Sequence, residues 1–157
     1  DGFLRTGDKG EQDGEGNLRL TGRLKEIFKT SKGKYVAPAP IENRLAVHSR
    51  IEQVCVVGDG LPQPIALCVL SDVGRQEAAN DGRGDLESSL RSLVEEVNGR
   101  LDQHERLQGL VLVSEVWGVE NGFLTPTLKI KRAVIENTYG ERFGEWQQRS
   151  EVVLWHD

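Results

Sequence analysis

Residues 51–70 read IEQVCVVGDGLPQPIALCVL, and this stretch decides the fold. Two apolar runs rich in β-branched residues, Ile51–Gly58 and Ile65–Leu70, lie on either side of the loop segment Gly58-Asp59-Gly60-Leu61-Pro62. Apolar runs separated by glycine and proline are typical of a hairpin with a longer loop. The stretch therefore predicts two neighbouring strands of a sheet.

Further patterns on both sides of this hairpin predict helices and one more strand. Pro38 and Pro40 favour the start of a helix, and the later helices have apolar residues at helical spacing. The predicted elements are helices over Ile41–Val47, Leu86–Leu101 and Arg132–Gln148, a third core strand over Leu110–Val116 and a loop over Gly122–Lys131. We assign no element to the polar stretch 72–85. The fold class is predicted as α+β, a small central sheet of about three strands flanked by helices.

The first 24 residues are rich in turns. Two short candidate strands, Phe3–Thr6 and Leu18–Thr21, flank the turn Asp13-Gly14-Glu15-Gly16-Asn17. A two-stranded hairpin is marginal by itself, so we expect this one to belong to a larger sheet. The chain also starts without Met. We therefore expect it to be a fragment of a longer protein.

Composition narrows the class of protein. The chain has 157 residues, with 20 Lys and Arg against 25 Asp and Glu, and a net charge of −5 argues against a free nucleic-acid binder. Three Trp and four Phe favour a packed core over disorder. No segment resembles a membrane span or a signal peptide. Cys55 and Cys68 are too few for a disulfide scaffold or a zinc site, which favours reduced thiols and a cytoplasmic location.

Motifs that are common to many protein families do not identify a functional site in this sequence. The segment Gly14-Glu15-Gly16-Asn17-Leu18-Arg19 lacks the third glycine of a dinucleotide fingerprint, so a hairpin turn is the better interpretation. His48, His104 and His156 have no metal-ligand spacing. Two lysine-rich segments, 25–34 and 129–132, are unusual in an acidic chain. They are either solvated loops or contacts for phosphate or carboxylate groups.

Four blocks of sequence resemble the C-terminal part of AMP-forming acyl-CoA synthetases. They are GFLRTGD at 2–8, GRLKE at 22–26, KGKYVAP at 32–38 and LTPTLKIKR at 124–132. Their order and spacing agree with the family over essentially the whole chain. The segment FKTSKGKYVAP at 28–38 is most similar to the long-chain fatty acid branch.

The resemblance implies roles for residues near the nucleotide and at a hinge. Asp8 matches the aspartate that accepts hydrogen bonds from the ATP ribose hydroxyls, a task that suits a carboxylate. Arg23 matches the arginine that reaches the ribose and phosphates. Lys25 occupies the hinge position between the tail of a large N-terminal adenylation domain, residues 1–24, and a C-terminal lid domain, residues 25–157.

It also implies an adenylation lysine and part of a CoA tunnel. Lys129 matches the lysine whose ammonium stabilises the α-phosphate during adenylation, with Lys131 as the alternative. Many relatives have glycine directly before this lysine, where this chain has Leu128. Gly33 matches the glycine that lines the pantetheine tunnel, because the absence of a side chain admits the thiol arm, and Lys34 lies beside it.

The implied parent is an ATP-dependent fatty acid–CoA ligase, which converts a carboxylate, ATP and CoA to acyl-CoA, AMP and pyrophosphate. The lid would rotate between the two half-reactions. The expected partners are the protein's own N-terminal domain, fatty acid, ATP and CoA, with no nucleic acid and with peripheral membrane contact left open. Mg²⁺ would be bound mainly by the N-terminal domain. The isolated chain is expected to be inactive, because the phosphate loop and the acyl pocket belong to that domain. The alternatives are an aryl-acid or luciferase-like ligase of the same superfamily, or a non-catalytic binding module.

Overall fold

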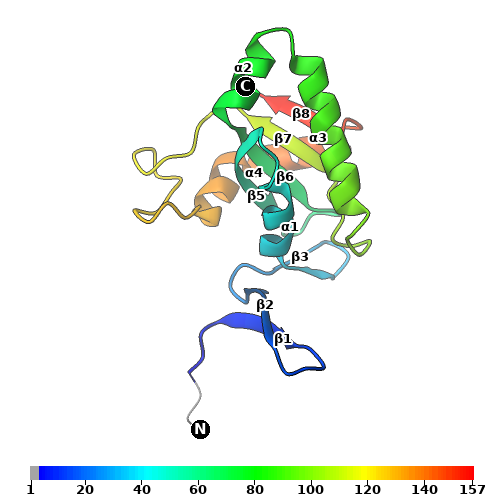
Figure 1. The fold of residues 1–157 in the computed structure, drawn as a ribbon, viewed down its shortest axis with the longest axis vertical. Helices are drawn as coiled ribbons and strands as arrows, with labels where there is room; N and C mark the ends of the chain where they lie inside the picture. The colour runs from blue at the N-terminus through cyan, green and yellow to red at the C-terminus, as the bar shows by residue number, and fades with distance from the viewer. Residues whose placement is uncertain (1–3) are drawn as a thin grey trace.

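The computed structural model describes residues 4–157, and a four-stranded mixed sheet forms its centre (Figure 1). The strands are β5 (Ile51–Val57), β6 (Ile65–Leu70), β7 (Gly109–Val113) and β8 (Val153–His156), in that spatial order. The predicted hairpin is confirmed, because β5 and β6 pair antiparallel from Ile51 with Leu70 to Val57 with Ile65. The pairs β6–β7 and β7–β8 are parallel.

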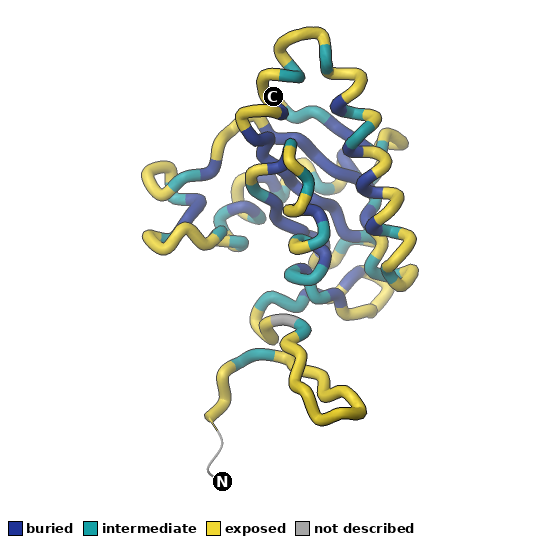
Figure 2. Tube along the Cα trace, in the orientation of Figure 1, coloured by how far each residue is buried: buried dark blue, intermediate teal, exposed yellow. Residues whose placement is uncertain are grey.

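Helices cover both faces of this sheet, which explains the continuous apolar runs. All six residues of β6 are buried, as expected for a strand that is covered on both sides. One core lies between the sheet and the helices α1 (Pro38–Leu45) and α3 (Arg83–Asn98). The other lies between the sheet and α4 (Arg132–Gln148) and includes Trp117 and Phe123. Figure 2 shows the buried strands enclosed by helices with exposed outer faces.

The α+β fold class is confirmed, and the structure has one more helix and one more strand in the central sheet than the sequence predicted. Strand β8 adds to the free edge of β7, but its four residues are too short to show a pattern. Helix α2 (Asp72–Ala79) lies in the stretch to which no element was assigned, and its one buried residue is Gly74. A Cβ at Gly74 would lie 2.8 Å from the Arg50 carbonyl oxygen. The absence of a side chain at Gly74 therefore lets the helix approach the backbone of Arg50 closely.

The other predicted helices and strands exist with shifted ends. Helix α1 begins at Pro38, as suits proline in a first turn, and not at Ile41. Helix α3 begins and ends three residues earlier than predicted. The third core strand, β7, ends at Val113 and not at Val116. The bounds of α4 agree with the prediction.

The prediction for the N-terminal hairpin is half wrong. Strand β2 (Leu18–Arg23) pairs antiparallel with β1 (Asp8–Gln12), and not with the predicted strand Phe3–Thr6. Leu4–Thr6 lies in no strand, and Phe3 lies outside the described residues. The reason is the tightness of the turn. The Asp13 carboxylate accepts hydrogen bonds from the backbone N–H groups of Glu15 and Asn17, both at 2.9 Å, so β1 must end directly before it.

A second small hairpin connects this segment to the domain core. Strands β3 (Phe28–Lys29) and β4 (Tyr35–Val36) pair antiparallel. Phe28 and Val36 are buried in the same core as α1 and α3. The β1–β2 hairpin, in contrast, is largely exposed (Figure 2).

The two cysteines are free thiols within the sheet, as their apolar surroundings in the sequence suggested. Cys55 lies on β5 and Cys68 on β6, and both are buried. Burial disfavours a thiolate, and it raises the pKa of Cys55 to about 12. These thiols are packing groups and not nucleophiles.

Candidate functional site

The structure brings Asp8 and Arg23 together at one end of the β1–β2 hairpin. They are paired residues of the two strands, and Arg23 Nε lies 3.7 Å from Asp8 Oδ1. The Arg23 side chain is 62% exposed and that of Asp8 28%. An ion pair this accessible to water adds little to stability. A carboxylate and a guanidinium are therefore presented side by side to solvent.

Lys25 lies in the turn that joins β2 to β3. The Glu26 N–H donates to the Arg23 carbonyl at 3.0 Å, so residues 23–26 form a β-turn with Lys25 at its third position. The preceding residue is also held, because the Leu24 N–H donates to the Gly7 carbonyl at 2.8 Å. The Lys25 side chain is exposed.

Gly33 and Lys34 lie in the turn between β3 and β4. Gly33 has a φ of +78°, a left-handed conformation that glycine adopts without cost. A Cβ there would meet only Lys29 Cε, at 3.8 Å. The backbone angle thus favours glycine at this position, and crowding within the described residues does not. Lys34 is exposed.

Lys129 lies near the tip of the loop that precedes α4. The base of this loop is fixed in the core, because Phe123 and Leu124 are buried and the Phe123 ring lies between Trp117 and Tyr139, with centroid distances of 6.1 and 6.3 Å. A β-bridge pairs Leu124 with Ile130. The loop therefore extends from a rigid base, and it presents an exposed Lys129.

Lys131, the alternative adenylation lysine, lies at the base of the same loop. Its backbone N–H donates to the Phe123 carbonyl at 2.8 Å, and it is the N-cap residue of α4. The tip of the loop thus carries Lys129, and the anchored base carries Lys131.

The predicted site residues form three groups that do not meet in this chain. Asp8 and Arg23 make one group, Gly33 and Lys34 the second and Lys129 the third. In Figure 1 the loop before α4 projects from one side of the domain, β3 and β4 lie toward the other, and the β1–β2 hairpin extends below both. The three groups can act on one substrate only if another surface completes the site or if parts of the protein move relative to one another.

An ion pair that the sequence analysis missed fixes the start of α4. Arg132 Nη2 donates to Glu42 Oε1 at 2.8 Å, and the same oxygen accepts the Val56 N–H at 2.8 Å. Arg132 Nη1 also donates to Cys55 Sγ at 3.2 Å. The two side chains are only 17% and 18% exposed. In the sequence, the one signal of this ion pair is an acidic residue directly after Ile41, an apolar residue that the structure shows to be buried on a short helix.

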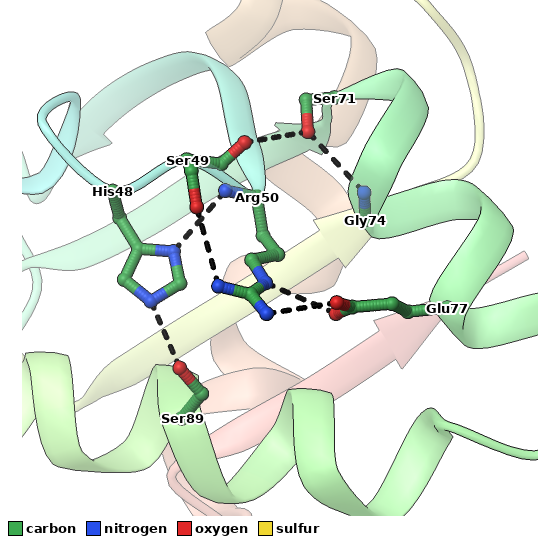
Figure 3. A network of polar contacts seen from close by, with 7 residues as sticks. All are labelled: His48, Ser49, Arg50, Ser71, Gly74, Glu77 and Ser89. Carbon is green, nitrogen blue, oxygen red and sulfur yellow. Dashed lines mark hydrogen bonds and ion pairs between the residues drawn. The ribbon is translucent and has the colours of Figure 1, made fainter.

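A second polar network holds the segment between α1 and β5 against α2 and α3 (Figure 3). Arg50 Nε and Nη2 donate to the two oxygens of Glu77 at 3.0 and 2.8 Å. His48 Nδ1 accepts the Arg50 N–H at 3.3 Å, so Nε2 carries the proton and donates to Ser89 Oγ at 2.9 Å. Burial and then the Arg50 charge lower the pKa of His48, and the Glu77 carboxylate opposes them.

Membrane-spanning helices and clusters of metal-binding side chains are both absent from the part of the chain that the structure describes. Within residues 4–157, no helix combines the length and apolarity that crossing a membrane requires. In the same range, no cluster of three or more His, Cys, Asp or Glu side chains could hold a metal ion.

Comparison with known families identifies the family of this chain. The family model of the AMP-binding enzyme C-terminal domain matches residues 25–145. The chain belongs to this family. The matched range of this AMP-binding enzyme C-terminal domain begins at Lys25, and strand β8 lies beyond its end.

Curated relatives include long-chain-fatty-acid–CoA ligases from distant organisms. The chain is 33% identical to FadD15 of Mycobacterium tuberculosis, over 88% of this chain and 25% of that protein. It is 32% identical to human long-chain-fatty-acid–CoA ligase 1, over 88% of this chain and 22% of that protein. The chain thus spans about a quarter of the length of the curated relatives that it matches.

Solved structures show the same fold. The adenylation domain of a carboxylate reductase from Mycobacterium chelonae superposes with a TM-score of 0.76 at 23% identity, over 89% of this chain and 22% of that one. A fatty acyl CoA synthetase of Mycobacterium tuberculosis superposes with a TM-score of 0.57 at 26% identity, over 90% of this chain and 25% of that one.

Proposed function

We propose that this chain is the C-terminal lid of an ATP-dependent long-chain fatty acid–CoA ligase. The observation that carries the proposal is an exposed Lys129 on a core-anchored loop, in a chain whose curated relatives are long-chain-fatty-acid–CoA ligases. In the first half-reaction a carboxylate oxygen attacks the α-phosphorus of ATP and pyrophosphate leaves. In the second, the CoA sulfur attacks the acyl carbonyl carbon, AMP leaves and the thiol proton is released.

Lys129 acts in the first half-reaction. Negative charge shifts between the attacking carboxylate, the α-phosphate and the departing pyrophosphate. A fixed ammonium stabilises that distribution more strongly in the transition state than in the ground state. The rigid base of the loop supports this role, because a positioned charge needs no reorganisation during the reaction.

Asp8 and Arg23 hold the nucleoside part of ATP and AMP. Asp8 accepts hydrogen bonds from the two ribose hydroxyls, and Arg23 donates to the ribose and phosphate region. Their adjacency across the β1–β2 pair supports this division of work. The ion pair between Asp8 and Arg23 is long and accessible to water. A nucleotide that binds to them therefore breaks only a weak interaction.

Gly33 and Lys34 act in the second half-reaction, at the CoA tunnel. The turn that holds them is exposed on the β3–β4 hairpin, together with the exposed side chains of Lys29 and Lys32. Such a group of ammonium ions suits the phosphates of CoA. The left-handed Gly33 gives the pantetheine arm a backbone without a side chain.

The lid works with a large N-terminal adenylation domain of the same protein, to which residues 1–24 belong. That domain supplies the phosphate loop, the acyl pocket and the Mg²⁺ site, while Lys25 is the hinge about which residues 25–157 turn. The two buried free thiols support a cytoplasmic enzyme, and a fatty acid substrate is consistent with peripheral contact with membranes.

Single-turnover kinetics of each half-reaction in the full-length protein tests the proposal. Lys129→Ala should slow formation of acyl-AMP about 10²–10³-fold, comparable to the loss of one preorganised electrostatic group. It should leave CoA attack on supplied acyl-AMP nearly unchanged. Lys131→Ala is the matched control and should have little effect, because Lys131 lies at the base of the loop. A larger adenylation defect in Lys131→Ala, or equal slowing of both steps by Lys129→Ala, contradicts the assignment.

A further inference from the structure

Two loops on different sides of the domain have the same turn geometry, although their sequences differ. The segment Thr30-Ser31-Lys32-Gly33-Lys34 joins β3 to β4, and Thr125-Pro126-Thr127-Leu128-Lys129 lies before α4. Each begins with threonine, has a left-handed residue at the fourth position and ends with lysine. The left-handed φ angles are +78° at Gly33 and +64° at Leu128.

The same three hydrogen bonds close both turns. In the second turn, the Thr125 N–H donates to the Lys129 carbonyl at 2.8 Å, the Leu128 N–H donates to the Thr125 carbonyl at 2.8 Å, and the Lys129 N–H donates to Thr125 Oγ1 at 3.0 Å. In the first turn, the corresponding bonds join Thr30 to Gly33 and Lys34 at 2.9, 2.9 and 3.3 Å. The threonine thus holds both backbone polar groups of the lysine four residues later.

This arrangement limits the directions that each lysine side chain can take. With the N–H and the carbonyl both bonded to one residue, the lysine peptide planes cannot rotate independently, so the Cα–Cβ direction is set by the turn. Each of the two turns is also attached to the buried core. Thr30 is buried, and Thr125 follows the buried Leu124.

We propose that Thr30 and Thr125 are positioning residues, each of which aims one lysine for one half-reaction. Thr125 holds Lys129 for adenylation, and Thr30 holds Lys34 for CoA. This inference rests on the proposed function for its chemistry, but the turn geometry stands apart from it. In this proposal neither hydroxyl group touches substrate. The Thr125 hydroxyl affects adenylation, and the Thr30 hydroxyl affects the CoA step.

The turn geometry can be tested on the 157-residue chain by amide hydrogen exchange. Thr125→Val keeps the shape of the side chain and removes the acceptor, so the Lys129 amide should exchange about tenfold faster. The Lys34 amide should not change. Thr30→Val should give the reverse pattern, and the serine variants Thr125→Ser and Thr30→Ser should restore protection. Valine variants that exchange like the unaltered chain overturn the inference.

The effect on chemistry is tested in the full-length protein by single-turnover kinetics. Thr125→Val should slow acyl-AMP formation about 10–100-fold, since small misplacements of a catalytic group have effects of this size, and leave the CoA step unchanged. Thr30→Val should raise the KM for CoA about tenfold without slowing adenylation. Each serine variant should recover most of the loss. Thr138→Val is the matched control, because Thr138 Oγ1 donates to the Val134 carbonyl within α4 and lies outside both turns.

The outcomes separate this inference from the proposed function. If the unaltered protein forms no acyl-AMP, the proposed function fails, whatever the exchange data show. If it does so and Thr125→Val reacts like Thr138→Val, or if both valine variants slow both steps alike, the positioning roles are wrong. Should Thr30→Val fail to fold because Thr30 is buried, the exposed loop of Thr125 decides the question alone.

Discussion

Leu128 adopts a backbone angle that its side chain disfavours. Its φ of +64° lies in the left-handed region, and the side chain is 70% exposed. A residue with a Cβ loses roughly 1–2 kcal/mol there relative to the right-handed region. The hydrogen bonds of the Thr125 turn hold the angle nevertheless.

Substitution of Leu128 should therefore change the free energy of unfolding according to how well the new residue tolerates the left-handed backbone angle. Leu128→Gly should raise the free energy of unfolding by about 0.5–1 kcal/mol, because the relief of the left-handed angle exceeds the entropy that glycine loses on folding. Leu128→Val should lower it, since a branched Cβ is worse at positive φ. Urea unfolding of both variants checks this. A Leu128→Val chain as stable as the unaltered one would show that the angle carries no strain.

His48 should make the stability of the chain sensitive to acid. Its pKa is lowered in the folded state by burial and by Arg50, while in the unfolded chain it is about 6.5. Between these two pKa values the unfolded state therefore binds more protons than the folded state. The stabilising contribution is present above about pH 6.5 and is lost as the pH falls through the folded pKa.

Urea unfolding between pH 7.5 and pH 5 (roughly the range around the histidine pKa) measures this contribution. His48→Gln retains an N–H donor for Ser89 but does not titrate, so its stability should fall less over that range. The Glu77 carboxylate is present in both chains, and its pKa is lowered first by its hydrogen bonds with Arg50, with the His48 charge as the last cause. Parallel pH profiles for the two chains would assign the acid sensitivity elsewhere.

Residue-level roles were only partly accessible from the sequence. Asp8, Arg23, Gly33 and Lys129 could be named by resemblance, but the pairing of Asp8 with Arg23 depends on the register of β1 and β2, which the sequence did not reveal. The turns of Thr30 and Thr125 were also missed. They share only threonine and lysine four residues apart, and one has glycine at its left-handed position where the other has leucine, so the common turn geometry is not evident from the sequence.

At the scale of elements, apolar periodicity predicted the secondary structure well where a whole face is buried. Helix α3 has five buried residues at helical spacing, and β6 is an uninterrupted apolar run. Helix α2 and strand β8 gave no such signal, because α2 buries only a glycine and β8 has four residues. Their positions depend on partners that are distant in sequence, namely Arg50 and strand β7.

The ion pair between Arg132 and Glu42 joins α4 to α1 and β5 across the edge of the sheet. Arg132→Met should lower the free energy of unfolding by about 2–3 kcal/mol, because it leaves a mostly buried carboxylate without its counter-charge. Adding Glu42→Gln removes that charge and keeps an acceptor for the Val56 N–H, so the double variant should be more stable than Arg132→Met.

Urea unfolding of the single and double variants measures the coupling. Arg142→Met is the control, because the pair Arg142–Glu145 is more than half exposed on α4. Such a surface pair should change stability by less than about 1 kcal/mol. If Arg132→Met changes stability as little as Arg142→Met, the pair does not hold α4 in place.

At the scale of the whole molecule, the turn at residues 23–26 joins the exposed β1–β2 hairpin to the packed domain. The predicted hinge, Lys25, is its third residue. Proline at that position restricts the preceding Leu24 to extended conformations, and proline is disfavoured at the third position of a type I turn, the commonest kind.

Lys25→Pro in the full-length protein should therefore disfavour the arrangement seen here and hold the lid in another one. One half-reaction should slow much more than the other, while the unfolding midpoint changes little. Separate single-turnover measurements of adenylation and CoA attack check this. His104→Pro is the matched control, because His104 is the third residue of the turn 102–105, which the Glu105 N–H closes to the Asp102 carbonyl at 2.9 Å and which lies outside the three groups. Equal loss of both steps in a folded Lys25→Pro protein would place the hinge elsewhere.

The mixed sheet also has a consequence for the order in which the domain assembles. Val57 pairs with Ile65 across one short loop, whereas Leu110 pairs with Val153 only after the whole of α4 has been passed. Contacts between residues close in sequence form faster, because less loop entropy is lost. The β5–β6 hairpin is therefore the natural nucleus, and β8 docks late. Until it does, the edge of β7 stays open to pairing with other chains, so the interval before β8 docks is the time at which this domain is most prone to aggregate.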